Sequence, residues 1–108
     1  MAITVNLYYT GKNGSARKFA QEMESSGTAD AIRAEDGNLR YEYFCPMNDP
    51  ETVLLIDSWR DQEAIDSHHA SPMMGALAAL REKYDLHMTV ERFTSVEIPE
   101  TEGQFIRK

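Results

Sequence analysis

Residues 39–59 read LRYEYFCPMNDPETVLLIDSW and contain two strand-like stretches on either side of a short connection. The first stretch alternates from residue to residue until Pro46, which has no backbone N–H and ends the strand. Residues 52–59 are dense in Val, Leu and Ile, which favour β-structure. The segment therefore predicts two antiparallel strands joined as a β-hairpin.

The residues before this hairpin predict a strand followed by a helix. Residues 3–9 alternate with the period of two that is typical of a strand, and neither side is strongly charged. Residues 11–14 predict a turn; they resemble a phosphate-binding nest but lack the spacing of a P-loop. Ser15 is then a candidate N-cap, and four apolar residues at helical spacing predict a helix: Ala16, Phe19, Ala20 and Met23. A short helical piece is expected within residues 28–34.

The residues after the hairpin predict helix and then strand. Asp61 is a candidate N-cap, and Ser71 and Pro72 restart the helix, which continues to about Lys83. A last strand is expected over residues 86–98. The order βαββαβ predicts an α+β fold, the ferredoxin-like split βαβ, in which two helices cover one face of a four-stranded antiparallel sheet.

The other face of this sheet has no helix to cover it. Because neither side of residues 3–9 is strongly charged, we expect this face to meet its copy in a homodimer. Residues 1–98 are interpreted as one domain, and residues 99–108 as a C-terminal tail that could dock on the partner subunit.

Composition excludes several classes of function. The 108 residues carry 11 Lys and Arg against 18 Asp and Glu, a formal charge of -7, which disfavours nucleic acid and anionic membrane surfaces as partners. No apolar run is long enough for a membrane span, and the first residues do not resemble a signal peptide. The single cysteine, Cys45, cannot form an internal disulfide. We therefore expect a cytoplasmic protein.

One stretch resembles a known family. Residues 54–59 (LLIDSW), Ala64 and Ile65, His68, and residues 71–74 (SPMM) are similar to the pattern of antibiotic biosynthesis monooxygenase domains. That pattern has an acidic residue two before a Trp, a His nine residues after the Trp, and a small-Pro-His-Met stretch. Five positions fit it: Asp57, Trp59, His68, Pro72 and Met74. Met73 departs from it, because many members have a second His there.

The resemblance implies a dimeric α+β barrel, and for several members a cofactor-independent monooxygenase that acts on hydroquinones or polycyclic phenols. Some relatives instead degrade haem with an Asn in the first strand and a Trp and a His on the second helix. Here Asn6 fits, but His68 occupies the Trp position and no His follows on that helix beyond His69. Haem degradation is therefore disfavoured, and no cofactor is expected.

His68 is the candidate catalytic base. A phenol must lose its proton before it can reduce oxygen readily, and imidazole has an unperturbed pKa of about 6.5. His68 shares a helix face with Ala64 and Ile65, which directs it inward. His69 points about 100° around the helix and is a secondary candidate. Adjacent histidines diverge on a helix and no Cys/His cluster is present, so no metal site is expected.

Five further residues are candidates for binding a substrate. Trp59 could form one wall of an aromatic slot, Asn6 could hydrogen-bond a quinol oxygen, and Tyr8 lies on the same side of its strand. Tyr43 and Met73 complete the set. Each residue also has a purely structural interpretation in the core or in local hydrogen bonding.

Two other functions remain open from the sequence. One is a non-enzymatic, dimeric ligand-binding or stress-response domain that has kept the fold without turnover, which Met73 in place of the second His favours. The other is a small-molecule isomerase with the same fold, which would need a base but no oxygen.

Overall fold

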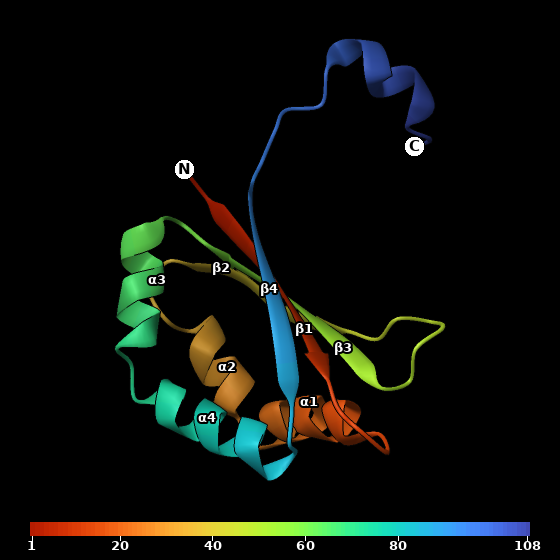
Figure 1. Ribbon diagram of the computed structural model, residues 1–108. Coiled ribbons are helices and arrows are strands. Elements are labelled where there is room, and N and C mark those ends of the chain that lie inside the picture. Colours follow the sequence, from red (N-terminus) through yellow and green to blue (C-terminus); the bar gives the residue numbers. More distant parts are fainter.

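The computed structural model describes residues 1–108 and contains a four-stranded sheet with four α-helices (Figure 1). In chain order the elements are β1 (Ile3–Thr10), α1 (Ser15–Ser25), α2 (Thr28–Arg33), β2 (Asn38–Phe44), β3 (Thr52–Trp59), α3 (Gln62–His69), α4 (Met73–Lys83), β4 (His87–Thr94) and a C-terminal 3₁₀ helix (Glu100–Phe105). None of the helices is long and apolar enough to cross a lipid bilayer.

The strands lie in the order β2-β3-β1-β4, and every neighbouring pair is antiparallel. The fold is thus the ferredoxin-like α+β arrangement, as the sequence predicts. The side chains of β3 alternate between buried and half-buried positions, with Val53, Leu55, Asp57 and Trp59 facing the helices. The helices cover this face alone.

The core lies between this face and the helices. Phe19 on α1 is fully buried, and its ring lies 4.9 Å from the ring of Tyr9 and 6.1 Å from that of Tyr43. Met23 and Ile32 are also fully buried in this cluster, which ties α1 and α2 to the sheet.

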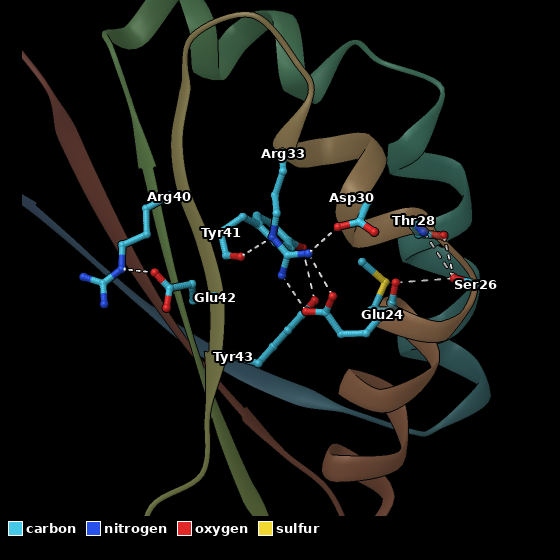
Figure 2. A network of polar contacts seen from close by, with 10 residues as sticks. Glu24, Ser26, Thr28, Asp30, Arg33, Arg40, Tyr41, Glu42 and Tyr43 are labelled. Carbon is cyan, nitrogen blue, oxygen red and sulfur yellow. Dashed lines mark hydrogen bonds and ion pairs between the residues drawn. The ribbon is translucent and has the colours of Figure 1, made fainter.

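A charged cluster fastens the end of α1 and α2 to strand β2 (Figure 2). The Arg33 guanidinium donates hydrogen bonds to the Glu24 and Asp30 carboxylates, and its Nε donates to the backbone oxygen of Tyr41 at 2.8 Å. Beside it, the hydroxyls of Tyr41 and Tyr43 lie 3.1 Å apart. Burial raises the pKa of both tyrosines, so both hydroxyls stay neutral here.

The turn before α1 differs from its expected form. Gly14 is the N-cap, with φ 79°, and Ser15 is the first helical residue; the Ser15 hydroxyl accepts a hydrogen bond from the Lys12 backbone N–H. The backbone N–H groups of Asn13 and Gly14 donate to the Glu51 carboxylate at 2.6 and 2.8 Å. The nest is therefore filled by a side chain of the same protein and holds the turn closed.

The end of β4 and the start of β2 also differ from expectation. Strand β4 ends at Thr94, not near residue 98, because the residues that follow no longer pair with β1. A register shift between Asn38 and Arg40 leaves Leu39 60% exposed, although its alternation groups it with the tyrosines.

The uncovered face and the tail both expose apolar side chains. The register places Asn6, Ile56 and Glu91 side by side on the uncovered face, as it does Tyr8, Leu54 and Thr89. Beyond β4 the chain leaves the body and ends far from the helices (Figure 1). Large apolar side chains beyond β4 are exposed: Val96 and Ile98 before the tail, and Phe105 and Ile106 within it.

The Phe19→Ala substitution should lower the free energy of unfolding by about 3–5 kcal/mol, because it removes a fully buried ring and leaves a cavity between Tyr9 and Tyr43. Urea unfolding followed by circular dichroism measures this change. Met47→Ala, at a fully exposed loop position, is the matched control and should stay within about 0.5 kcal/mol of the wild type. Equal stabilities of the two variants would contradict the assigned core.

Candidate active site

A cavity of about 250 Å³ lies on the helix-facing side of the sheet, between strand β4 and helices α3 and α4. Its lining is mostly apolar, with a few polar side chains that converge on it, as is typical of small-molecule sites. The residues that line it are Val5, Leu7, Tyr41, Leu55, Asp57, Trp59, Gln62, Ile65, His68, His69, Met74, Leu77, Arg81, Met88, Val90 and Arg92. The cavity opens beside β4, whose residues are all exposed.

Helix α3 directs His68 toward this cavity. The Asp61 side chain caps the helix by accepting a hydrogen bond from the Ala64 backbone N–H at 2.9 Å. One turn further on, His68 shares the buried face with Ala64 and Ile65 and is only 5% exposed. Its ring stacks on that of Trp59, with centroids 4.6 Å apart and an angle of 28° between the planes. The stack fixes the orientation of the imidazole.

Glu35 holds the other side of His68. One Glu35 carboxylate oxygen lies 2.7 Å from His68 Nδ1, although the two residues are 33 positions apart. A carboxylate accepts hydrogen bonds, so we assign Nδ1 as the donor to Glu35. Nε2 makes no hydrogen bond within the chain. It therefore keeps a lone pair that can accept a proton, as in other carboxylate–histidine pairs.

A close approach of two segments brings Glu35 to this position. Gly37 adopts φ 85°, a conformation that favours glycine, and its backbone oxygen accepts a hydrogen bond from the Arg60 backbone N–H at 2.8 Å. A Cβ at Gly37 would lie only 2.5 Å from the Ala64 Cβ. The loop that carries Glu35 can thus pack against α3 only because residue 37 has no side chain.

Asp57 is a second titratable group in the cavity. It lies on β3 two residues before Trp59 and is 7% exposed. Burial raises the pKa of Asp57 to about 7, a hydrogen bond from the Trp59 side chain opposes this rise, and the charge of Glu35 adds to it. The carboxyl therefore changes its charge near neutral pH.

Two arginines complete the polar part of the cavity. Arg81 on α4 donates a hydrogen bond from Nη2 to the Tyr9 hydroxyl at 2.8 Å. Arg92 on β4 donates a hydrogen bond to the Gln62 side chain on α3 and so links β4, an edge strand of the sheet, to this helix. No group of three or more His, Cys, Asp or Glu side chains is placed to hold a metal ion.

The structure brings together only some of the residues singled out from the sequence. His68 and Trp59 line the cavity in contact with each other, and His69 also lines it. Asn6 and Tyr8 lie on the opposite face of the sheet, because β1 directs Val5, Leu7 and Tyr9 toward the helices. Asn6 and Tyr8 therefore do not share a pocket with His68 of the same chain, contrary to the expectation from the sequence.

Two other residues that were expected to line the cavity do not line it, and residues close to them in the sequence do. Tyr43 packs against Phe19 in the core, and Tyr41 lines the cavity instead. Met73 and Met74 both pack against the core cluster, but only Met74 also lines the cavity. Adjacent residues of a helix point about 100° apart, so one step along α4 changes which side chain reaches the cavity.

Sequence reasoning did not assign Glu35, Asp57 or Arg81 to the site. The signal for Asp57 was present, since it is the one acidic residue in the apolar stretch 53–59 and shares its parity with Trp59. Glu35 lies in a turn, and no local pattern indicates its pairing with His68.

The fold and this cavity define a small α+β domain of the ferredoxin-like type with an aromatic-lined site. Residues 2–80 match the family model described as antibiotic biosynthesis monooxygenase, and the chain belongs to this family. A relative in Bacillus subtilis (strain 168), YcnE, provisionally named a monooxygenase, is 27% identical over 67 residues, which are 62% of this chain and 68% of that protein.

Solved structures show the same fold. SnoaB from Streptomyces nogalater, a cofactor-independent oxygenase, superposes with a TM-score of 0.76 at 17% identity and covers 92% of this chain and 97% of its own. A protein from Deinococcus radiodurans, provisionally named an antibiotic biosynthesis monooxygenase, gives a TM-score of 0.75 at 20% identity, with coverage of 93% and 97%.

The raised pKa of Asp57 makes stability depend on pH. Between about pH 4 and pH 7 the folded protein holds a proton that the unfolded chain has lost, so the contribution of Asp57 to stability falls as pH rises through this window. Asp57→Asn has no carboxyl that can titrate at this position. As the pH rises, its free energy of unfolding should therefore increase relative to that of the wild type, by up to about 1.4 kcal/mol for each pH unit.

Urea unfolding of both proteins from pH 4.5 to pH 8 measures this difference. Asp66→Asn, at an exposed position on α3, is the control and should show no such trend. A difference between Asp57→Asn and wild type that stays constant with pH would contradict the assignment.

Proposed function

We propose that this protein is a cofactor-independent monooxygenase that oxidises a hydroquinone-like or phenolic small molecule with O₂. The observation that carries the proposal is His68, which is held by Glu35 on one side and Trp59 on another while it faces an apolar cavity. The family to which the chain belongs supports it, and so does the fold shared with a cofactor-independent oxygenase.

The chemistry begins with a proton transfer. His68 Nε2 takes the proton of a phenolic hydroxyl, and the imidazolium is stabilised by the Glu35 carboxylate at Nδ1. The phenolate is electron-rich enough to reduce O₂, and a carbon–oxygen bond forms at a ring carbon. Loss of water from the resulting hydroperoxide leaves a quinone carbonyl. One oxygen atom enters the product, the other leaves as water, and the substrate supplies all four electrons.

The cavity limits the size and shape of the substrate. Its volume of about 250 Å³ lies just below the range of about 300–1,000 Å³ that drug-sized ligands occupy. Trp59 and Tyr41 supply aromatic surfaces, while Leu7, Leu77 and Met88 supply apolar ones. A ligand of one or two fused aromatic rings fits this space better than a larger polycycle.

We further propose that two copies pair through the uncovered face of the sheet. This face carries Leu54 and Ile56 on β3, and Phe44 and Phe93 on the outer strands, with no helix over them. The exposed apolar side chains of the tail then find a surface on the partner subunit. A domain of this size has few other ways to bury so much apolar area.

Oxygen uptake by chelator-treated protein tests the oxygenase proposal across a panel of hydroquinones and naphthols. Uptake should exceed the rate of autoxidation, and His68→Gln should lower the enzymatic rate by about 100-fold or more, because it removes the base. His87→Gln, at an exposed position on β4, is the matched control and should retain the wild-type rate.

Other outcomes separate the alternatives. Conversion of a substrate without oxygen would indicate an isomerase, and a thermal shift without any turnover would indicate a binding domain. Uptake that is equal in His68→Gln and in wild type would remove His68 from the mechanism.

The dimer is tested by Ile56→Arg, which places a charge at the centre of the uncovered face and should yield a monomer. Sedimentation velocity at micromolar concentrations measures the mass of both proteins. Met47→Arg, in an exposed loop, should leave the mass unchanged. A monomeric wild type would contradict the proposal.

A further inference from the structure

Charged and apolar side chains are separated along the sheet that forms the floor of the cavity. The register places Asp57, Val5 and Arg92 side by side in one row across β3, β1 and β4, and all three line the cavity. The neighbouring row of lining residues on these strands is entirely apolar: Leu55, Leu7 and Val90. The floor therefore has a charged row with an arginine at its β4 end, and an apolar row beside it.

Arg92 has no acidic partner. It lies on edge strand β4 and is exposed. Its Nη2 donates a hydrogen bond to the uncharged side-chain oxygen of Gln62, and Gln62 in turn donates to Asp66. No carboxylate lies within 4 Å of the Arg92 guanidinium, although the chain has 18 Asp and Glu residues. The guanidinium has several N–H donors, so it can bind a further acceptor while it keeps the bond to Gln62.

The cavity is more positive than the protein around it, whose formal charge is -7. Arg81 and Arg92 both line it, and neither forms an ion pair. Asp57 is the only carboxyl among the lining residues, and burial raises its pKa to about 7, so it is mostly neutral below that pH. The local positive potential favours an anionic ligand in an otherwise acidic protein.

Of these two cations, only Arg92 is open to a ligand. Arg81 Nε is buried, and its Nη2 is held by the Tyr9 hydroxyl. A planar guanidinium binds a carboxylate through two parallel hydrogen bonds, and its single charge matches that of the carboxylate. A phosphate carries a second charge, for which the cavity offers no other accessible arginine or lysine.

We propose that Arg92 binds a carboxylate group of the ligand at the β4 side of the cavity, while the aromatic ring of the ligand lies against the apolar row. This inference rests on the proposed function and narrows its substrate class to a phenol that also carries a carboxylate. Arg92 is then a specificity-determining residue: it selects and orients the substrate and takes no part in the proton transfer to His68.

Binding of an aromatic acid that has no hydroxyl group tests this inference separately from oxidation. Calorimetry at pH 6 in low-salt buffer compares 2-naphthoate with 2-naphthamide, which has a similar shape and no charge. At this pH the Asp57 carboxyl is mostly protonated, whereas the ligand carboxyl, with a pKa of about 4, is ionised. Wild type should bind the naphthoate about 10-fold or more tightly than the amide.

In Arg92→Gln this preference should fall to about threefold or less, because the charged partner of the carboxylate is gone. Arg107→Gln is the matched control: it removes the same charge at an exposed position of the tail and should keep the wild-type preference. Both ligands are compared within each protein, so a loss of packing at residue 92 weakens both and leaves their ratio unchanged.

A wild type that does not bind the naphthoate, or that binds both ligands equally, would overturn the inference. A preference that is unchanged in Arg92→Gln would overturn it as well. Neither ligand has a hydroxyl group to oxidise, so the result is independent of oxygen uptake. Failure of the oxygenase proposal would leave the carboxylate preference intact, and failure of the preference would leave oxidation of uncharged phenols intact.

Discussion

The alternation of strand β3 is the constraint on which the rest of this structure depends. β3 pairs with β2 on one side and β1 on the other, so its register sets the faces of three strands. Its period of two sends Val53, Leu55, Asp57 and Trp59 to the helices and leaves Ile56 on the uncovered side. A slip of one residue would exchange core and surface along the whole strand. Core, cavity wall and uncovered face therefore all follow from one stretch of sequence.

The site combines this rigid strand with a helix and a turn that reach it from elsewhere in the chain. Trp59 supplies a flat surface, His68 stacks on it, and Glu35 fixes the proton on the far ring nitrogen. Each contact restricts the orientation of the imidazole ring. Gly37 makes the arrangement possible, because its missing side chain lets the turn pack against α3.

Much of the fold could be predicted from periodicity, and less of the site could. The alternation around Trp59 and the helical spacing of Ala64, Ile65 and His68 are local patterns, and the structure confirms them. The contact with Glu35 spans 33 residues and depends on a turn with a positive φ, which no periodicity encodes. The polarity of Asn6 makes it a candidate for binding a substrate, although its own alternation places it opposite the apolar side of β1. The alternation is the better guide to the side of the sheet on which a residue lies, because that side is set by the position of the residue along the strand and not by its polarity.

A chain of 108 residues can barely provide both a cavity and a further apolar surface, and in this structure the two lie on opposite faces of the sheet. A cavity removes packing from the core, and a small domain has little apolar area to spare. Here the cavity lies where α3 and α4 leave β4 uncovered, and the opposite face of the sheet has no helix over it. Pairing through that face would stiffen the floor of the cavity from behind without occupying it.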